Sequence, residues 1–384
     1  MSERAAAGPR KPRIALVLPG GGARAAYQVG VLQAIAGWCP PGVPLPFDVL
    51  CGTSAGAINA AVIAARADHV QRAAADLAGV WSQFHVEQVF RTGTLDMIRS
   101  GLHLLFALVS GGLLLPMPRA LFNNLPLRAL LQRSVDFGAL ARAVDAGRPD
   151  AVAVMATSVT SGDSVAFVQA SRAFRPWDRA GRKGVAATLA LEHLMASSAI
   201  PLLFPTVAMH GQHFGDGAMR QSTPLAPALH LGADRILVIG SRQAERPAPA
   251  EAPEPPEPNL ADHFGFMLDS LFMEGLQSDL ERLARVNSLI ARLPPGGAPF
   301  GLRHVETLLL LPQRDLSEIA LAHRMAIPGT LRAFLRILGA TGARGGRLLS
   351  FLLFESRYTR ELMRLGEHDA EARRAEIAAF LELR

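Results

Sequence analysis

Short apolar runs, glycine-rich turns and helical stretches alternate in the first part of the chain. Residues 14–18 are a β-branched apolar run between two prolines, which predicts a buried strand. Three glycines follow, and residues 23–36 place apolar side chains at helical spacing. Residues 47–51 predict a second short strand, and an alanine-rich helix is predicted at 57–67. Two consecutive strand–turn–helix units indicate an α/β fold with a parallel sheet.

The same patterns predict further elements along the rest of the chain. Strands are expected at residues 151–159, 164–169, 206–209, 212–214, 235–239 and 305–311. Hairpin turns are expected at Ser161-Gly162-Asp163 and at His210-Gly211. Residues 245–258 are a Pro/Ala/Glu tract that cannot bury a core, and residues 262–293 read as one long helix. We therefore expect a main domain over residues 12–315 and a helical C-terminal appendage over residues 316–384.

Composition adds the prospect of contact with lipid. Hydrophobic residues make up 49% of the chain and charged residues 19%, and the formal net charge is +6. Lysine occurs only at Lys11 and Lys183, so nearly all the positive charge is arginine. The general amino-acid usage of the source organism explains this preference for arginine, and attraction to an anionic membrane surface is the functional alternative. The arginines are scattered without an aromatic-basic face, so no nucleic-acid partner is predicted.

The chain shows no sign of secretion or of a membrane span. Two cysteines, Cys39 and Cys51, cannot form a disulfide framework, and residues 1–13 lack an apolar signal segment. The leucine-rich segment 102–117 is interrupted by glycine and proline and is shorter than the roughly 20 residues of a spanning helix. We expect it to be a core helix, a lid or acyl-binding wall, or a segment that contacts the membrane. The expected location is cytoplasmic, with transient contact at the inner membrane surface.

The sequence Gly52-Thr53-Ser54-Ala55-Gly56 matches the nucleophile-elbow pattern G-x-S-x-G. A predicted strand precedes it and a predicted helix follows it, which is the context that the pattern requires. A serine on such a turn has its hydroxyl exposed at a helix N-terminus, and the flanking Gly52 and Gly56 remove clashing Cβ atoms. The alternative is a serine that only caps the helix.

The turn Gly20-Gly21-Gly22 offers a second piece of the same chemistry. Three glycines between a strand and a helix expose successive backbone N–H groups, which can bind an anion. The anion is either a nucleotide phosphate or the oxyanion of an acyl-transfer intermediate. Because no ribose-binding acid follows the second strand, nucleotide binding is disfavoured.

An activated serine needs a base, and Asp216 is the best-presented candidate. It lies in Phe214-Gly215-Asp216-Gly217-Ala218, directly after a predicted strand. In a desolvated cleft the pKa of this carboxylate would rise, which would make it a better base near neutral pH. A turn aspartate that bonds its own backbone is the alternative role. A Ser–His–Asp arrangement with His210 or His213 also remains open.

Taken in order, these segments resemble the patatin-like phospholipase family. The resemblance rests on the glycine turn with Arg24, on Gly52–Gly56, on Ala196-Ser197-Ser198-Ala199-Ile200-Pro201 and on Asp216-Gly217-Ala218. It covers about residues 12–242. It implies a three-layer patatin-like fold with a mostly parallel central sheet and a helical C-terminal extension, which is itself similar to an appendage of bacterial members.

The resemblance also implies a mechanism and a substrate. Ser54 would be the nucleophile and Asp216 the base, with an oxyanion hole at Gly20, Gly21 and Gly22. Arg24 would support this loop electrostatically, or pair with a carboxylate. The family often has glycine where this chain has Ala25, which affects local packing more than activity.

The implied substrates are phospholipids, lysophospholipids or other acyl lipids. No metal and no cofactor is predicted, because the sequence has no EF-hand loop and no closely spaced metal-ligand cluster. A catalytically silent lipid-binding protein of the same fold remains an alternative.

Overall fold

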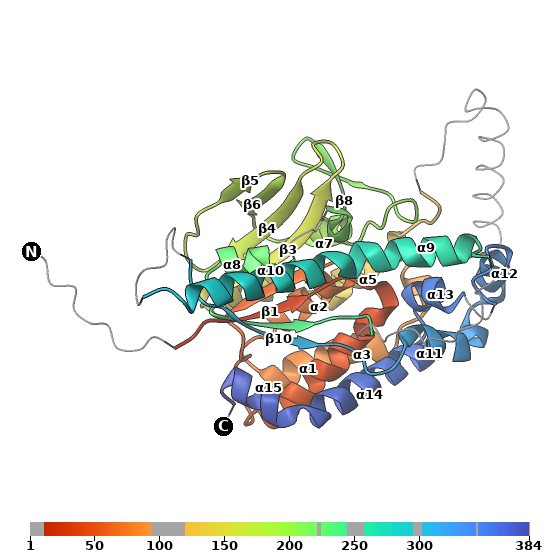
Figure 1. Ribbon diagram of the computed structural model, residues 1–384. Coiled ribbons are helices and arrows are strands. Elements are labelled where there is room, and N and C mark those ends of the chain that lie inside the picture. Colours follow the sequence, from red (N-terminus) through yellow and green to blue (C-terminus); the bar gives the residue numbers. More distant parts are fainter. Residues whose placement is uncertain are drawn as a thin grey trace, which may run out of the picture.

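A single mixed sheet forms the centre of the protein, as the computed structural model in Figure 1 shows. The structure describes residues 11–91, 93, 120–220, 224–243, 257–294, 302–342 and 345–383. The strands are β1 (Ile14–Leu18), β2 (Val49–Thr53), β3 (Ala151–Ser158), β4 (Ser164–Ala170), β5 (Trp177–Arg179), β6 (Arg182–Ala186), β7 (Val207–Met209), β8 (Gln212–Asp216), β9 (Arg235–Ile239) and β10 (Glu306–Leu310). Their order in the sheet is β10-β9-β1-β2-β3-β4-β6-β5, and β8 pairs with β3 and β7.

Helices cover much of this sheet. They are α1 (Ala26–Trp38), α2 (Ala55–Ala64), α3 (Val70–Ser82), α5 (Leu125–Ser134), α6 (Phe137–Asp145), α7 (Leu191–Ser197), α8 (Ala226–His230), α9 (Leu260–Asp269), α10 (Gly275–Ile290), α11 (Leu316–Ala322), α12 (Gly329–Ile337), α13 (Gly346–Leu352), α14 (Ser356–Ala372) and α15 (Arg374–Leu381). The shorter helical turns are η1 (Gly22–Ala25), η2 (Val86–Gln88), η3 (Gly217–Arg220), η4 (Ser270–Glu274) and η6 (Arg324–Ala326).

The strand order places helices on both faces of the sheet. Strands β10, β9, β1, β2 and β3 are mutually parallel. The chain crosses from β1 to β2 through α1, and in the opposite sense along the sheet from β9 to β10 through α9 and α10. Because such crossovers are right-handed, α1 and α10 must lie on opposite faces. Figure 1 shows this arrangement, with α1, α3 and α14 below the sheet and α10 across its other side.

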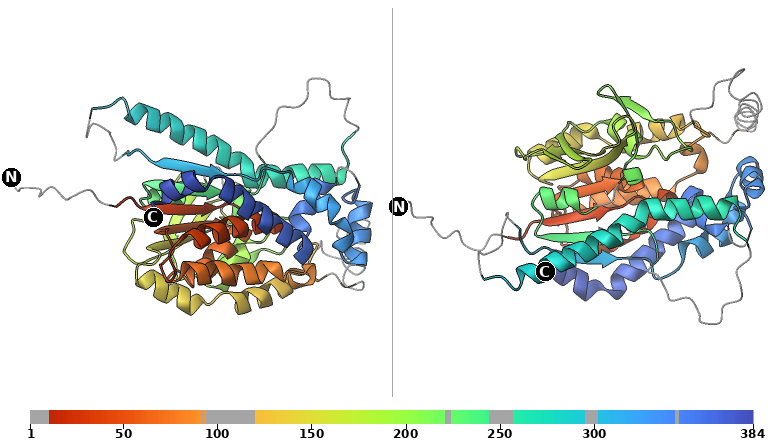
Figure 2. Two further views of the ribbon diagram at one scale, coloured as in Figure 1. Left: turned by 90° about the horizontal axis from the view of Figure 1, so that it is seen from below. Right: turned by 45° about the horizontal axis from the view of Figure 1, so that its top comes forward.

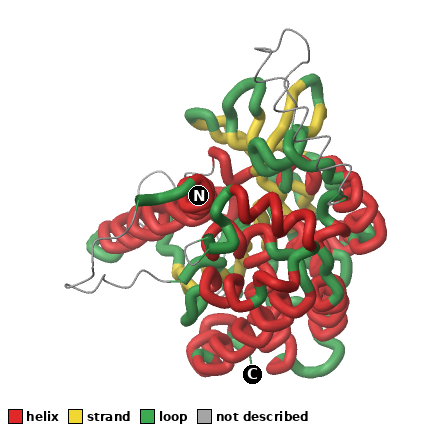
Figure 3. Tube along the Cα trace, turned by 90° about the vertical axis from the view of Figure 1, so that its right-hand side faces the viewer, coloured by secondary structure: helices red, strands yellow, loops and turns green. Residues whose placement is uncertain are grey.

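The predicted fold class is confirmed: the protein is α/β with a central sheet of mostly parallel strands. The first strand begins and ends as predicted, and both expected hairpins form, as β3–β4 and β7–β8. Strands β5 and β6 were not predicted. They extend the sheet at the edge where Figure 3 shows strands above the layer of helices.

The prediction of one helix over residues 262–293 was wrong in detail. The segment is helical, but the π-helical turn η4 separates α9 from α10. A π turn adds a residue to the helical repeat and re-aims the side chains within it. The helix predicted from residue 23 likewise begins as the 3₁₀ turn η1, and α1 starts at Ala26. The segment 102–117 and residues 245–256 of the Pro/Ala/Glu tract lie outside the described residues.

The C-terminal helices pack directly on the first helix of the chain. Figure 2 shows α14 lying along α1 when the molecule is viewed from below. Glycines allow the approach, because a Cβ on Gly30 would lie 1.8 Å from the carbonyl oxygen of Met363, and one on Gly366 would lie 2.2 Å from that of Tyr27. Thr359 also donates to the carbonyl of Trp81 at 2.7 Å. The division at residues 315 and 316 stays a prediction.

Candidate active site

Ser54 lies on a strained turn between β2 and α2. Its backbone angles are φ 54° and ψ −127°, a left-handed region that costs a non-glycine residue about 1–3 kcal/mol. The neighbouring glycines make the turn possible: a Cβ on Gly52 would lie 2.4 Å from Cα of Ala57, and one on Gly56 would lie 2.0 Å from the carbonyl oxygen of Leu18. The elbow predicted from the sequence therefore has the backbone conformation that the pattern requires.

Strand β3 brings Asp216 to Ser54. One edge of β3 pairs with β2 up to the pair Thr53–Met155. The same edge then pairs with β8, starting at Ala156 and Asp216. Two strands that follow one another along one edge of a third must meet end to end. Ser54, the residue after Thr53, is thereby placed beside Asp216, although 162 positions separate them in the sequence.

The Asp216 carboxylate is buried and only partly hydrogen-bonded. Its exposed fraction is 1%, and Oδ1 accepts a hydrogen bond from the backbone N–H of Ala218 at 2.9 Å. Burial raises the pKa of Asp216 to about 7, against a lowering by hydrogen bonding from the Ser54 hydroxyl and from the Ala218 N–H. The Ser54 contact is loose, because Oδ2 has no hydrogen-bond partner of ordinary length and angle. The carboxylate thus keeps one oxygen available to take a proton.

The glycine turn Gly20–Gly22 is packed so closely that a Cβ atom at any of its positions would clash with a neighbouring residue. A Cβ on Gly20 would lie 2.3 Å from the ring of Phe272, and one on Gly21 would lie 2.4 Å from Oγ of Ser241. Gly22 has φ +54°, and its Cβ would lie 2.4 Å from the carbonyl oxygen of Phe351. The turn is therefore enclosed on several sides and held close to the end of β2.

A chain of buried polar side chains holds this turn, and sequence reasoning missed it. Gln28 donates to the carbonyls of Pro19 and Ile239, and Asn59 donates to Gln28 at 2.9 Å. Trp81 donates in turn to Asn59 at 2.8 Å. Gln28 and Asn59 stand in otherwise apolar helical stretches, and that contrast is the sequence signal by which they might have been found.

The segment around Ser197 also reaches the elbow. The backbone N–H of Ser54 donates to Oγ of Ser197 at 2.9 Å. From the sequence, this segment stood out only as part of the resemblance to the family. Its contribution depends on α7 packing against the end of β8, which no local pattern reveals.

Arg24 is buried with a carboxylate partner. Its guanidinium donates to Asp269 at 2.6 Å and to Oγ of Ser350 at 2.7 Å, and it lies 3.9 Å from the ring centre of Phe351. Asp269 also pairs with the more exposed Arg347. Of the two roles expected for Arg24, the pair with a carboxylate is present, and it ties the glycine turn to α9 and α13.

Ser54 faces a narrow apolar cavity of about 40 Å³. Gly22, Ser54 and Ser198 supply polar positions in its wall, together with Ser134. The rest of the wall is apolar: Ala55, Ile58, Val80, Trp81, Phe84, Val89, Leu127, Leu130, Leu131, Ile200, Phe204 and Phe354. Such a lining suits a hydrocarbon chain and offers little to a polar one.

The histidines of the alternative triad lie elsewhere. Side chains alternate between the two faces of a strand, and His213 lies three positions before Asp216 in β8. The His213 side chain therefore points to the opposite face from Asp216, where its ring contacts Thr206. His210 is exposed and lines a different cavity from Ser54, together with His193. Neither observation favours a histidine as the base.

Within the residues that the structure describes, no cluster of three His, Cys, Asp or Glu side chains is arranged to hold a metal ion. None of the helices in the described ranges combines the length and apolarity needed to cross a bilayer. Cys39 and Cys51 are both free and buried.

A serine on a strained elbow, a buried aspartate and a glycine turn thus lie together in an α/β fold with a mostly parallel central sheet. Residues 16–229, more than half of the chain, match the family Patatin-like phospholipase, and the protein belongs to that family. Its members act on lipid esters, so lipids are the general substrate class.

Other comparisons add little. None of the curated proteins matches the chain. Among solved structures it is similar to VipD from Legionella pneumophila, with 13% identity, 92% of this chain and 67% of that chain covered, and a TM-score of 0.35.

Proposed function

We propose that this protein hydrolyses carboxylic esters of phospholipids, lysophospholipids or other acyl lipids through a Ser54–Asp216 dyad. The observation that carries the proposal is the meeting of these two side chains at the wall of an apolar cavity. The serine is on a strained elbow, and the aspartate has a free oxygen and a pKa of about 7. A group with this pKa is ionised in about half the molecules at neutral pH, which suits a general base.

In the proposed reaction, Asp216 takes the proton of Ser54 as its hydroxyl oxygen attacks the ester carbonyl. Backbone N–H groups of Gly20, Gly21 and Gly22 stabilise the oxyanion, and Gly22 faces the same cavity as Ser54. Asp216 then gives its proton to the departing alcohol. Asp216 deprotonates a water molecule, which attacks the acyl-enzyme. The bond to the Ser54 oxygen then breaks, this oxygen takes the proton back from Asp216, and the fatty acid is released. No cofactor takes part.

Arg24 has no direct contact with the substrate in this proposal and acts through the glycine turn. Since its guanidinium is engaged with Asp269 and Ser350, it holds the glycine turn in place and adds positive potential behind it. We assign it positioning of the oxyanion hole.

The proposed setting is the surface of a membrane, reached from the cytoplasm by transient contact. Two large apolar side chains on α9 support this: Phe266 is 62% exposed and Met267 is 36% exposed. Apolar side chains that remain in water on a helix face suit contact with lipid.

The test compares Ser54→Ala and Asp216→Asn with the wild type in hydrolysis of a long-chain ester. Each change should lower kcat by at least about 10³-fold, because nucleophile and base act as a unit. His213→Ala and His210→Ala serve as matched controls and should keep most of the activity. Loss of activity in a histidine variant, equal to that of Ser54→Ala, would instead support a Ser–His–Asp esterase.

A fluorophosphonate probe distinguishes the enzyme from a silent lipid-binding protein. Wild-type protein should be labelled at Ser54, and the Ser54→Ala variant should not. An unlabelled wild type with an intact fold, checked by circular dichroism, would favour the silent alternative.

A further inference from the structure

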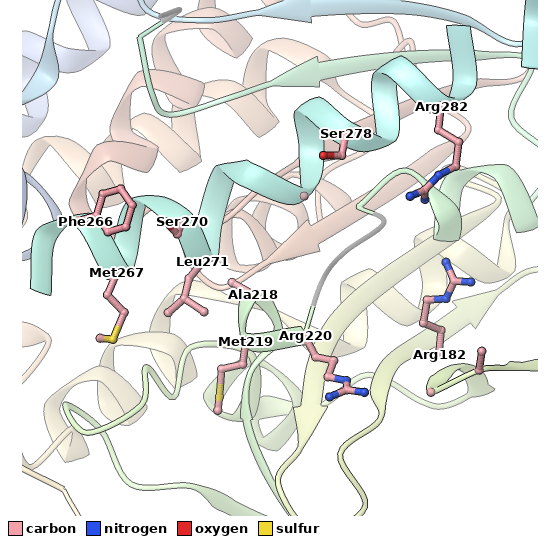
Figure 4. A pocket seen from close by; sticks show the side chains of 13 residues that line it. Arg182, Ala218, Met219, Arg220, Phe266, Met267, Ser270, Leu271, Ser278 and Arg282 are labelled. Atoms are coloured by element: carbon pink, nitrogen blue, oxygen red, sulfur yellow. The ribbon is translucent and has the colours of Figure 1, made fainter. Parts of the chain in front are cut away.

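A second cavity, much larger than the one at Ser54, opens on the surface beside the dyad. It measures about 930 Å³ and is bounded by α9, η4 and α10 on one side and by β6 and η3 on the other. Figure 4 shows it from close by. The dyad mechanism uses none of its side chains.

One end of this cavity is strongly basic. Arg182 from β6, Arg220 from η3 and Arg282 from α10 line it, so three elements distant in sequence each contribute a guanidinium. In Figure 4, Arg182 and Arg282 extend toward one another across the opening, and Arg220 lies below them. None of the described residues that line the cavity is acidic. Arg282 has a nearby carboxylate in Asp279, at 3.6 Å, but that group is buried and also accepts from the backbone of Leu225.

The other end of the same cavity is apolar. Phe266, Met267 and Leu271 line it, and Figure 4 places them away from Arg182 and Arg282, whereas Met219 lies next to Arg220. A ligand with an anionic group at one end and hydrocarbon at the other would complement this lining.

Two contacts connect this cavity to the dyad. Ala218 lines the cavity, and its N–H donates to Asp216 at 2.9 Å. Leu271 also lines it, and the next residue, Phe272, places its ring against Gly20 of the predicted oxyanion turn. The site thus stands between an internal apolar cavity at Ser54 and an external amphiphilic one.

We propose that the arginine end of this cavity binds the phosphate of a lipid headgroup, and that the protein selects phosphate-bearing acyl lipids over neutral glycerides. This rests on the proposed function of Ser54 and Asp216. Guanidinium groups match phosphate oxygens with charge-assisted, often paired hydrogen bonds, which a glyceride hydroxyl cannot form. In this arrangement the ester carbonyl lies at Ser54 with the acyl chain directed toward the narrow apolar cavity there, and the alcohol side of the ester, with its phosphate, occupies the outer cavity.

The kinetic test uses two substrates with the same acyl chain, a monoacylglycerol phosphate and a monoacylglycerol, both below their critical micelle concentrations. Arg220→Gln should lower kcat/KM for the phosphate substrate by about tenfold and leave the neutral substrate unchanged, because one charge-assisted contact is lost. Arg282→Gln should act in the same direction. The matched control is Arg285→Gln, an exposed arginine one turn along α10 that does not line the cavity.

Equal loss on both substrates, or no loss on either, would overturn the headgroup site. Thermal unfolding of each variant is measured as well, since Arg282→Gln also removes the contact with Asp279. A variant that melts at the wild-type temperature and loses selectivity supports the proposal.

Direct binding separates this proposal from the catalytic one. Ser54→Ala protein is titrated by calorimetry with monoacylglycerol phosphate, with and without Arg220→Gln. Binding that weakens about tenfold in the double variant supports the headgroup site even if the wild type hydrolyses neither substrate, a result that would defeat only the proposed function. Absence of binding overturns the headgroup site.

Two further arms identify the source of the phosphate. If inorganic phosphate binds as tightly as the monoacylglycerol phosphate, the site is one for free phosphate and the headgroup assignment is wrong. If Arg220→Gln weakens binding only to vesicles that contain anionic lipid, and leaves kcat/KM for the dispersed substrate unchanged, the arginines serve membrane attraction and the proposal also fails.

Discussion

At the scale of single residues, the site depends on a carboxylate that is costly to bury. Asp216 is 1% exposed and has two hydrogen-bonding groups near it, the Ala218 N–H and the Ser54 hydroxyl. These do not replace the hydration that the charged form loses, so its pKa rises from 3.8 to about 7. The same burial that would suit Asp216 to the proposed role of base near neutral pH makes its ionised form unfavourable in the folded protein.

Activity should therefore depend on pH through Asp216. If the base must be ionised, kcat/KM should rise about tenfold from pH 6 to pH 8 and level off above, because the pKa is about 7. The measurement is hydrolysis of an uncharged ester across this range. A flat profile between pH 6 and pH 8 would contradict Asp216 as the base with this pKa.

The same ionisation of Asp216 should lower the stability of the folded protein as pH rises, whereas it raises activity. The folded-state pKa of Asp216 lies above its model value, so the folded protein binds this proton more tightly than the unfolded chain, and stability is lost as pH rises from about 4 to about 7. Asp216→Asn removes this loss. Its advantage in free energy of unfolding over wild type should be larger at pH 8 than at pH 5 by about 2–3 kcal/mol. Urea unfolding at both pH values measures it, and an advantage independent of pH would count against the buried charge.

At the scale of elements, the site is a junction of strand ends and helix contacts. The shared edge of β3 joins the ends of β2 and β8, which brings the serine and the aspartate together. The glycine turn is then fixed from outside the sheet by Arg24, whose partners lie on α9 and α13. The elements that position the chemistry thus come from almost the whole length of the chain.

Arg24→Met should lower the free energy of unfolding by about 3 kcal/mol, because it leaves the buried carboxylate of Asp269 without its closest partner. The matched control is Arg347→Met, which removes the half-exposed partner of the same carboxylate and should cost less than about 1 kcal/mol. The measurement is urea unfolding at neutral pH. The double variant Arg24→Met, Asp269→Asn should cost less than the sum of the single changes, and strict additivity would argue against a coupled pair.

At the scale of the whole molecule, the C-terminal helices are part of the main packing. Helix α14 meets α1 through Gly30 and Gly366, and Ser350 of α13 holds Arg24. Removing these helices would expose the buried face of α1 and release the glycine turn.

A chain that ends at residue 315 should therefore fail to form a cooperative native state, since it lacks α11 to α15. A shorter truncation after Arg373, which removes only α15, is the control and should still fold. Near-ultraviolet circular dichroism and thermal unfolding measure both. Cooperative melting of the longer truncation at the wild-type temperature would show that residues 316–384 are a separable appendage.

Local sequence determined those parts of the protein that depend on neighbouring residues. The elbow at Ser54 follows from two glycines that remove clashing Cβ atoms, and the first strands and both hairpins follow from apolar runs and turn residues. The glycines around Asp216 likewise marked it as a candidate before its neighbours were known. A resemblance in ordered motifs then indicated the family.

Only the tertiary structure decided what these residues meet. It placed Asp216 beside Ser54 through β3, matched Arg24 with Asp269, and set Gln28 and Asn59 behind the glycine turn. It also replaced one expected helix with α9, η4 and α10, which brought Phe272 to Gly20 and opened the basic cavity nearby. These contacts join residues far apart in the chain. Patterns along the sequence report local conformation and burial, but pairing across the sheet and packing between its layers fix which distant groups share one site.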